Sequence, residues 1–273
     1  MNIITGEKIQ EQCDLYLGHP GDFQFNPRIF KQTEKCMNLD SIPSSWNNPR
    51  TLFVYGHCLP DFQMILDRLE NEFILVSHNS DENITNKYLS LLEHPKLLFW
   101  HAQNVMIDHP KLGCIPIGIA NSMWRHGNVD SLKRVINVKS PKTRDIYFYF
   151  NTGTNKSERN SCLSQVSEKG ILFGPHLEFS NYLNHLATCK YAISPPGNGV
   201  DCHRVWECLY LGVIPILKRS VFTEKLAKKF HCVLLDKWSD LNMKALLESY
   251  PGPRFYEDLT LDHIDLKNTI KYF

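Results

Sequence analysis

The chain has 273 residues, of which 42% are hydrophobic and 22% charged, as in globular proteins. This length suffices for one large domain or two small ones, each with a buried core. The formal net charge of +1 provides no overall positive field and argues against nucleic acid as the main partner. The nine cysteines include no CxxC pair, so we expect reduced thiols and no structural zinc.

The N-terminal residues carry no basic segment followed by an apolar core, which a signal peptide requires. No stretch approaches the ~20 apolar residues that cross a bilayer as a helix. We therefore expect a soluble cytoplasmic protein without a transmembrane segment.

The first half of the chain alternates strands and helices after a loop-rich start. Glycines and prolines predict loops for residues 1 to about 50. Strands are predicted at 51–55, 72–77, 96–101 and 114–119, and helices at 61–70 and 84–92. This alternation predicts a parallel sheet. The polar, basic segment 138–144 is the predicted linker to a second domain.

Polar side chains follow the second predicted strand, beginning with His78 and Asn79. Because α/β sheets place ligands at the carboxyl ends of their strands, we expect a site here. Asp81 or His78 can act as a base that takes a proton from a hydroxyl group, and His57 is a third candidate. The alternative is that Ser80 or Asp81 only caps the following helix.

The fourth predicted strand is followed by Asn121, Trp124, Arg125 and His126. An aromatic ring beside amide, imidazole and guanidinium groups suits a sugar, which has an apolar face and a polar rim. Together with Asn79, these residues are the predicted acceptor-binding site. The alternative is a tryptophan that only anchors its loop.

The alternation of strands and helices restarts after the linker. Strands are predicted at 146–150, 171–173, 190–194, 213–217 and 232–235. Helices are predicted at 156–168, 179–187, 201–211, 222–229, 240–249 and 255–272. Two consecutive sheets of this kind predict two Rossmann-like domains.

The segment 189–220 predicts a strand, a loop, a helix and a second strand. The loop from Pro195 to Gly199 delivers small residues with bare N–H groups to the helix start, a common place to hold a diphosphate. Asp201 is the predicted helix cap, and Gly212 ends the helix in a left-handed conformation. His203 and Arg204 follow in the first turn and provide cations, and Glu207 lies one turn further, where a carboxylate can bind ribose hydroxyls. The alternative is an ordinary βαβ crossover with a Pro/Gly turn.

A second loop of this kind opens the C-terminal half. Asn151 and Thr152 follow a strand and precede a helix that contains Arg159. The alternative is a polar loop with a solvated arginine. The sequence contains neither GxxxxGK[ST] nor GxGxxG, so a P-loop or a dinucleotide fingerprint is excluded.

The stretch SPPGNGVDCHRVWECLYLGVIPIL resembles the signature of exostosin-like glycosyltransferases. In that signature a (S/P)-P-x-G turn precedes R-x-x-E-(A/C)-L-x-x-G-x-I-P-(V/I). The residues that fall on it are Ser194, Pro196, Gly197, Arg204, Glu207, Gly212, Ile214 and Pro215. The likeness is strong over about thirty residues and extends from about Asp145 to Leu235. It is similar in particular to compact versions found in large DNA viruses, one of which is a xylosyltransferase; in a viral protein the expected location becomes the host cytoplasm.

The resemblance implies a GT-B fold, in which two Rossmann-like domains face each other across a cleft. We accordingly expect an N-terminal acceptor-side domain at 1–140, a nucleotide-sugar domain at 141–253 and, at 254–273, a C-terminal helix that packs back on the first domain. It also implies an inverting transfer from a UDP-sugar, UDP-xylose among the candidates, to a hydroxyl of a glycan acceptor. The implied donor-binding residues are Asn151, Thr152, Arg159, Phe173, Ser194, Pro196, Gly197, Asn198, Gly199, His203, Arg204 and Glu207.

The sequence contains no Asp-x-Asp motif, through which many transferases hold a metal. Arginines are then expected to neutralise the diphosphate, so the enzyme needs neither a metal nor another cofactor. The main alternative is a non-catalytic carbohydrate- or nucleotide-binding protein of the same fold. A sulfotransferase is disfavoured because no P-loop-like phosphate motif occurs.

Overall fold

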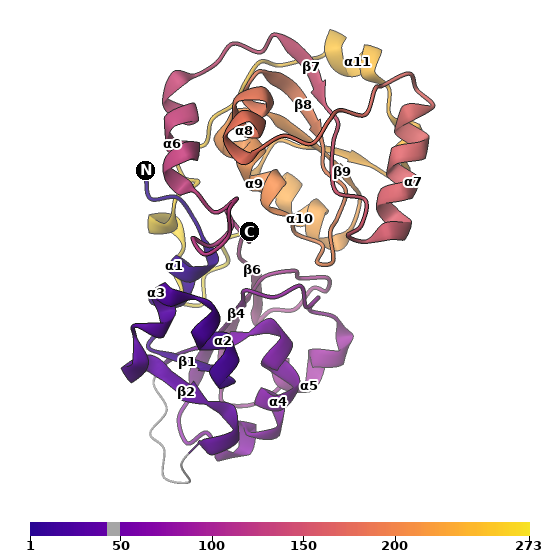
Figure 1. Ribbon diagram of the computed structural model, residues 1–273. Helices are drawn as coiled ribbons and strands as arrows, with labels where there is room; N and C mark the ends of the chain where they lie inside the picture. The colour runs from indigo at the N-terminus through magenta and orange to yellow at the C-terminus, as the bar shows by residue number, and fades with distance from the viewer. Residues whose placement is uncertain (43–49) are drawn as a thin grey trace. The chain divides into compact units, whose positions relative to one another are not determined.

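The computed structural model describes residues 1–42 and 50–273 and divides the chain into two compact units (Figure 1). Unit 1 comprises Met1–Gly127 and Thr260–Phe273, and unit 2 comprises Asn128–Leu259. Each unit contains a parallel sheet, so the chain is an α/β protein consistent with two Rossmann-like domains. The boundary after Gly127 precedes the predicted linker at 138–144, which lies within unit 2.

The sheet of unit 1 has six strands in the order β2-β1-β3-β4-β5-β6. Their bounds are Leu15–Gly18 (β1), Cys36–Asn38 (β2), Thr51–Tyr55 (β3), Phe73–His78 (β4), Leu97–Ala102 (β5) and Leu112–Cys114 (β6). All neighbouring pairs are parallel, and β3 and β4 are buried along their whole length. Runs of Leu, Ile, Val and Phe form such strands because both faces are covered. The strand order reverses between β1 and β3, which makes this pair the topological switch point of the sheet.

The first forty residues are not the loops that the sequence predicted. They contain β1 and β2 and three short helices, α1 (Gly6–Glu11), α2 (Pro20–Phe25) and α3 (Pro27–Phe30). Pro20 and Pro27 each occupy the first helical position, where a missing N–H group costs nothing. These prolines therefore start helices. Residues 43–49 of the predicted loop region lie outside the described residues.

Two further elements of unit 1 differ from the prediction. The predicted helix at 61–70 is a short helix, α4 (Leu59–Met64), followed by a 3₁₀ turn at Leu66–Arg68, and the one at 84–92 is a 3₁₀ turn at Asn86–Tyr88 followed by α5 (Leu89–Leu92). The predicted strand at 114–119 ends at Cys114. Gly118 adopts a left-handed φ of 66°, and the Ile119 N–H donates to the Ile4 carbonyl at 2.9 Å. The segment therefore leaves the sheet and packs on the N-terminal residues.

The sheet of unit 2 has four strands in the order β10-β9-β8-β7. They are Arg144–Tyr147 (β7), Cys189–Ile193 (β8), Ile214–Lys218 (β9) and Val233–Leu235 (β10). The helices are Val129–Val138 (α6), Lys156–Ser167 (α7), Phe179–Ala187 (α8), His203–Tyr210 (α9), Val221–Lys229 (α10) and Met243–Glu248 (α11). Most match their predictions within a few residues, but α6 was not predicted. The predicted strand at 171–173 is not formed, although the Phe173 ring packs with Phe148 and Phe150.

The core of unit 2 joins α7 and α11 to one face of the sheet. Cys162 and Val166 of α7 belong to one buried cluster with Tyr191 and Ile193 of β8, and Leu246 of α11 packs against this cluster. Lys142 fixes helices α8 and α9, because its ammonium group donates to the carbonyls of Ala187 and Leu211 at 2.7 Å each. A cation at the C-terminal ends of helices is favourable there.

The final segment of the chain belongs to unit 1 but is not the helix that was predicted at 255–272. Its regular part is one 3₁₀ turn, Leu261–His263. Hydrogen bonds to distant residues hold it: the Leu261 N–H donates to Asn2 O at 2.9 Å and His101 Nε2 to Asn268 O at 2.9 Å. These contacts replace the local bonds of a helix. Within the described part of the chain, none of the helices combines the length and the apolar character that a membrane crossing demands.

The buried His101 predicts an acid-sensitive fold. Burial lowers its pKa from 6.5 to about 4. The unfolded chain therefore binds a proton between these pH values that the folded protein excludes, so stability is complete above pH 6.5 and falls as the pH drops toward 4. The corresponding loss is about 3 kcal/mol for this side chain.

We expect His101→Gln, which keeps a donor for Asn268 O but cannot titrate, to flatten the loss of melting temperature between pH 6.5 and 4. The exposed His176→Gln serves as the matched control. Equal pH dependence in all three proteins would contradict this assignment.

Candidate functional site

Two loops follow neighbouring strands at the carboxyl edge of the unit 2 sheet, and one arginine joins them. Arg159, in the first turn of α7, donates from Nε to Pro196 O at 3.0 Å and from Nη1 to Asn151 O at 2.7 Å. Asn155 Nδ2 adds a bond to Gly197 O at 2.8 Å. The structure thus brings together the two loops that the sequence singled out.

Gly197 lies at the closest approach of these loops. A Cβ atom there would lie 3.4 Å from Arg159 Nη2 and 3.5 Å from Cys202 Sγ, which is ordinary van der Waals contact. Its N–H donates to Cys202 Sγ at 3.1 Å. This amide is therefore engaged within the protein, so at Gly197 the loop does not present the bare N–H group that the sequence predicted.

The starts of α7 and α9 have a feature in common. Their N-cap residues, Asn155 and Cys202, do not cap the helix with a side chain. Asp201, the predicted cap, is buried just before the helix and accepts from Trp206 Nε1 at 2.8 Å. A helix start without a capping side chain retains its partial positive charge, which favours an anionic ligand.

Arg204 in the first turn of α9 is held by two tyrosines and a carboxylate. Its guanidinium carbon lies 5.4 Å from the ring centroid of Tyr147 and 5.7 Å from that of Tyr182. Arg204 Nε donates to Tyr182 Oη at 3.4 Å, and this hydroxyl donates to Glu207 Oε2 at 2.5 Å. Tyr182, which the sequence reasoning missed, connects the two predicted residues.

Glu207 is only 4% exposed, and burial raises the pKa of its carboxyl group. A side chain so enclosed, with one oxygen bonded to Tyr182, is placed to orient Arg204 rather than to meet a ribose. The sequence predicted Glu207 as a site residue but not its contact with Tyr182.

The positive charges of Arg159 and Arg204 also repel each other. Burial lowers the pKa of Arg159, and the neighbouring charge of Arg204 lowers it further. Two cations in a half-buried place repel each other until an anion neutralises them. Their proximity therefore favours a phosphate-bearing ligand.

The other predicted donor residues vary in exposure. Ser194 is buried and donates its N–H to Ile216 O at 3.0 Å. Phe173 is half-buried, with its ring centroid 5.2 Å from that of Tyr149. Thr152, Pro196 and His203 are half-buried, Gly199 is buried, and Asn151 and Asn198 are exposed.

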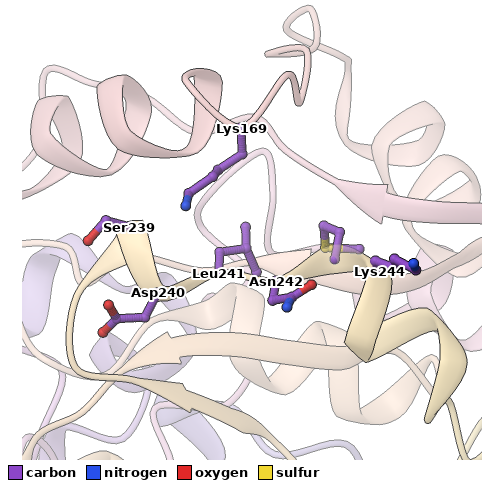
Figure 2. A pocket seen from close by; sticks show the side chains of 7 residues that line it. Lys169, Ser239, Asp240, Leu241, Asn242 and Lys244 are labelled. Carbon is purple, nitrogen blue, oxygen red and sulfur yellow. The ribbon is translucent and has the colours of Figure 1, made fainter.

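A separate pocket of about 490 Å³ lies at the opposite end of α7. Figure 2 shows Lys169 on one side of it and the chain from Ser239 to Lys244 on the other. Its lining is largely polar and solvent-exposed, and the residues of the two joined loops do not contribute to it. We therefore do not assign the site there.

In unit 1, His78 is closed off from any ligand. It is 1% exposed, accepts from Asn79 N at 2.7 Å through Nδ1 and donates to Pro116 O at 3.0 Å through Nε2. Burial lowers its pKa, so the imidazole is neutral. Since both ring nitrogens are engaged, His78 has no nitrogen left to take a proton from a substrate.

Helix α1 covers this part of the sheet edge. A Cβ atom on Gly6 would overlap Asn79 Oδ1, so only glycine fits at the start of the helix. Asn79 Nδ2 donates to Gln10 Oε1 at 3.1 Å, and Asn121 Nδ2 donates to Asn79 Oδ1 at 3.0 Å. The two asparagines that we predicted to bind an acceptor thus hold α1 in place.

Asp81 has a different environment from His78. It is exposed and follows β4 in an irregular loop. The next helical turn begins at Asn86 with Thr85 as its N-cap, and Ser80 Oγ accepts from Glu82 N at 3.2 Å. Neither Ser80 nor Asp81 caps this turn, which rules out the capping alternative.

The predicted sugar-binding tryptophan is part of an exposed aromatic group. Trp124 is 45% exposed, its ring stacks on His126 at 6.2 Å and 20°, and it meets Phe25 at 5.4 Å. Phe25, itself 60% exposed, lies in the region predicted as loops and was missed. Arg125 is exposed beside them. Such exposure is unusual for a residue that only anchors its loop.

A scan against models of known protein families matches none of them, and no curated protein is significantly similar to the chain. The resemblance of residues 194–217 to exostosin-like enzymes therefore remains a prediction, to be tested through the site itself.

Proposed function

We propose that the chain is an inverting glycosyltransferase that moves a sugar from a UDP-sugar, UDP-xylose among the candidates, to a hydroxyl of a glycan acceptor. The observation that carries the proposal is the pair Arg159 and Arg204. These cations lie at two helix starts, beside loops that follow adjacent strands. A nucleoside diphosphate needs such a combination of guanidinium groups and helix N-termini.

In this proposal Arg204 is the main partner of the diphosphate. Two of the donor groups of Arg159 already bind the carbonyls of Pro196 and Asn151, so its remaining donors and its charge assist. Glu207 and Tyr182 act by holding the guanidinium of Arg204 in place. The arginines then stabilise the negative charge that develops on the leaving UDP, without a metal or another cofactor.

The acceptor belongs to unit 1 in this proposal. The two units would face each other across a cleft, as in GT-B transferases. The rings of Trp124, His126 and Phe25 offer a platform for the apolar face of a sugar. Asp81 takes the proton of the acceptor hydroxyl as the oxygen attacks the anomeric carbon and the bond to UDP breaks.

A second candidate is a non-catalytic carbohydrate- or nucleotide-binding protein of the same fold. The closure of His78 and Asn79 by α1 favours it, because it removes His78 from the three base candidates and leaves the exposed Asp81 and His57. Release of UDP from a UDP-sugar in the presence of glycan acceptors would separate the two functions.

Replacement of Arg204 tests the donor site. We expect Arg204→Gln to weaken UDP binding ~10- to 100-fold, since it removes a charge-assisted contact to phosphate. Isothermal titration calorimetry measures this change. The control is Arg219→Gln in the same unit, an exposed arginine paired with Asp236 and Glu224. Unchanged UDP affinity in a folded Arg204→Gln protein would refute the assignment.

Removal of metal ions with a chelator tests whether the sugar transfer requires a metal. We expect turnover in excess EDTA to persist, because guanidinium groups neutralise the diphosphate. The measurement is the rate of UDP release with and without the chelator. A loss of activity that added magnesium or manganese restores would show that a metal holds the diphosphate after all.

Replacement of Asp81 tests catalysis directly. We expect Asp81→Asn to lower kcat by ~10²- to 10⁴-fold, the usual contribution of a general base, with UDP affinity and melting temperature nearly unchanged. The matched control is Asp67→Asn, an exposed aspartate elsewhere in unit 1. Near-normal turnover of Asp81→Asn would remove this residue from the mechanism and leave the binding protein as the better explanation.

A further inference from the structure

A cluster of mixed metal-ligand types lies in unit 1, outside the residues of the proposed transfer. Asp22, His57 and Cys58 each offer one ligand atom, and these atoms lie within 4.8 Å of one another. Asp22 Oδ1 is 2.8 Å from His57 Nε2, and Cys58 Sγ is 3.3 Å from Asp22 Oδ2. One carboxylate, one imidazole and one thiol thus lie close enough together to reach a single metal ion.

The position of the cluster in the sheet is informative. Asp22 belongs to α2, which follows β1, and His57 and Cys58 belong to the 3₁₀ turn that follows β3. Strands β1 and β3 are neighbours, and the strand order reverses between them. The carboxyl edge at such a switch point is where α/β sheets bind ligands.

A second layer of groups orients the carboxylate of Asp22 and adds negative charge. The backbone N–H of His19 donates to Asp22 Oδ2 at 2.8 Å. The His19 ring lies 3.1 Å from Asp61 Oδ2 and 3.4 Å from Asp40 Oδ2. Outer groups of this kind fix ligand geometry at metal centres, and the surplus of carboxylates attracts a cation.

We propose that Asp22, His57 and Cys58 bind a divalent transition metal, with zinc the best match. Thiolate and imidazole ligands select zinc over magnesium or calcium, which take oxygen ligands. Metal bonds of ~2.0–2.3 Å in a tetrahedral site separate ligand atoms by roughly 3.3–3.8 Å, so small side-chain shifts suffice. On binding, Cys58 releases its thiol proton and His57 binds through an unprotonated Nε2.

The metal would join the loops after β1 and β3, and three protein ligands would leave its fourth position open to water. The Cys58 side chain is buried, whereas that of His57 is 51% exposed. Three protein ligands with one open position is the arrangement of zinc sites that admit water or a further ligand. This site is independent of the donor site in unit 2, and magnesium cannot replace zinc at a thiolate.

Cobalt(II) is the probe of choice for the full-length chain, after removal of metals by a chelator. We expect one equivalent of cobalt to bind with a thiolate-to-metal charge-transfer band and the visible spectrum of a four-coordinate ion, and zinc to displace it. His57→Gln should weaken zinc binding at least ~100-fold, since even the loss of an outer-layer partner costs 10- to 100-fold. Cys58→Ser should abolish the charge-transfer band.

The matched controls are His109→Gln and Cys36→Ser, which lie outside the cluster and should leave cobalt binding unchanged. Because Cys58 is buried, its variant is compared only if circular dichroism shows a folded protein. The side chain of His57 is half-exposed, so His57→Gln tests metal binding without disturbing the buried core. Absence of a bound equivalent, a spectrum without the thiolate band, or unchanged binding by His57→Gln would overturn the proposal.

Discussion

The guanidinium group of Arg159 fixes the geometry on which the candidate donor site depends. Residues 151–155 and 194–199, in the loops after β7 and β8, have few side chains that could pack into a core, because they are largely small and polar. Two hydrogen bonds from Arg159 to Pro196 O and Asn151 O join them, and Asn155 adds a third to Gly197 O. Net contributions of about 1.5–3 kcal/mol are typical for hydrogen bonds from a charged donor, so this single side chain can hold both loops.

The same arrangement places two guanidinium groups in a half-buried site. Partial removal of these charges from water is unfavourable, and the residues around Arg204 compensate for it. Arg204 lies against the rings of Tyr147 and Tyr182, whose faces attract a cation. Glu207 supplies the compensating negative charge through Tyr182. A buried carboxylate without such partners would be strongly unfavourable, so Glu207 and Arg204 depend on each other. The signature residues of the helix are thus linked by contact as well as by spacing.

Much of unit 2 could be predicted from the sequence because its elements are regular. Helix α8 has the predicted bounds, and Gly212 ends α9 with a φ of 65° as expected. The predictions from sequence fail where contacts between distant residues determine the conformation. The sequence predicted Asp201 as a helix cap but not its hydrogen bond from the indole of Trp206 on α9. The local sequence pattern does not indicate which hydrogen-bond partner the carboxylate has in the fold.

Unit 1 was harder to predict for a related reason. Helices α1, α2 and α3 have only four to six residues each, too few for a periodic pattern, and they depend on tertiary packing. Glu7 and Gln10 of α1 could not be recognised as partners of Asn121 and Asn79 from sequence alone. The ligand types of the metal cluster were equally hidden, because Asp22 is separated from His57 and Cys58 by two strands.

The two units use the carboxyl edges of their sheets differently, and this difference bears on where catalysis can occur. In unit 2 the edge carries two cations at helix starts whose N-cap side chains do not cap them. In unit 1, α1 fills the edge at β4, and the Asp22 cluster occupies the edge at β1 and β3. In the proposed glycosyltransferase, a base in unit 1 would therefore have to lie beyond the end of its strand, where solvent and an acceptor could reach it. Asp81 meets that condition and His78 does not, because Asp81 is exposed and separated from the end of β4 by two residues, whereas His78 is buried within the strand.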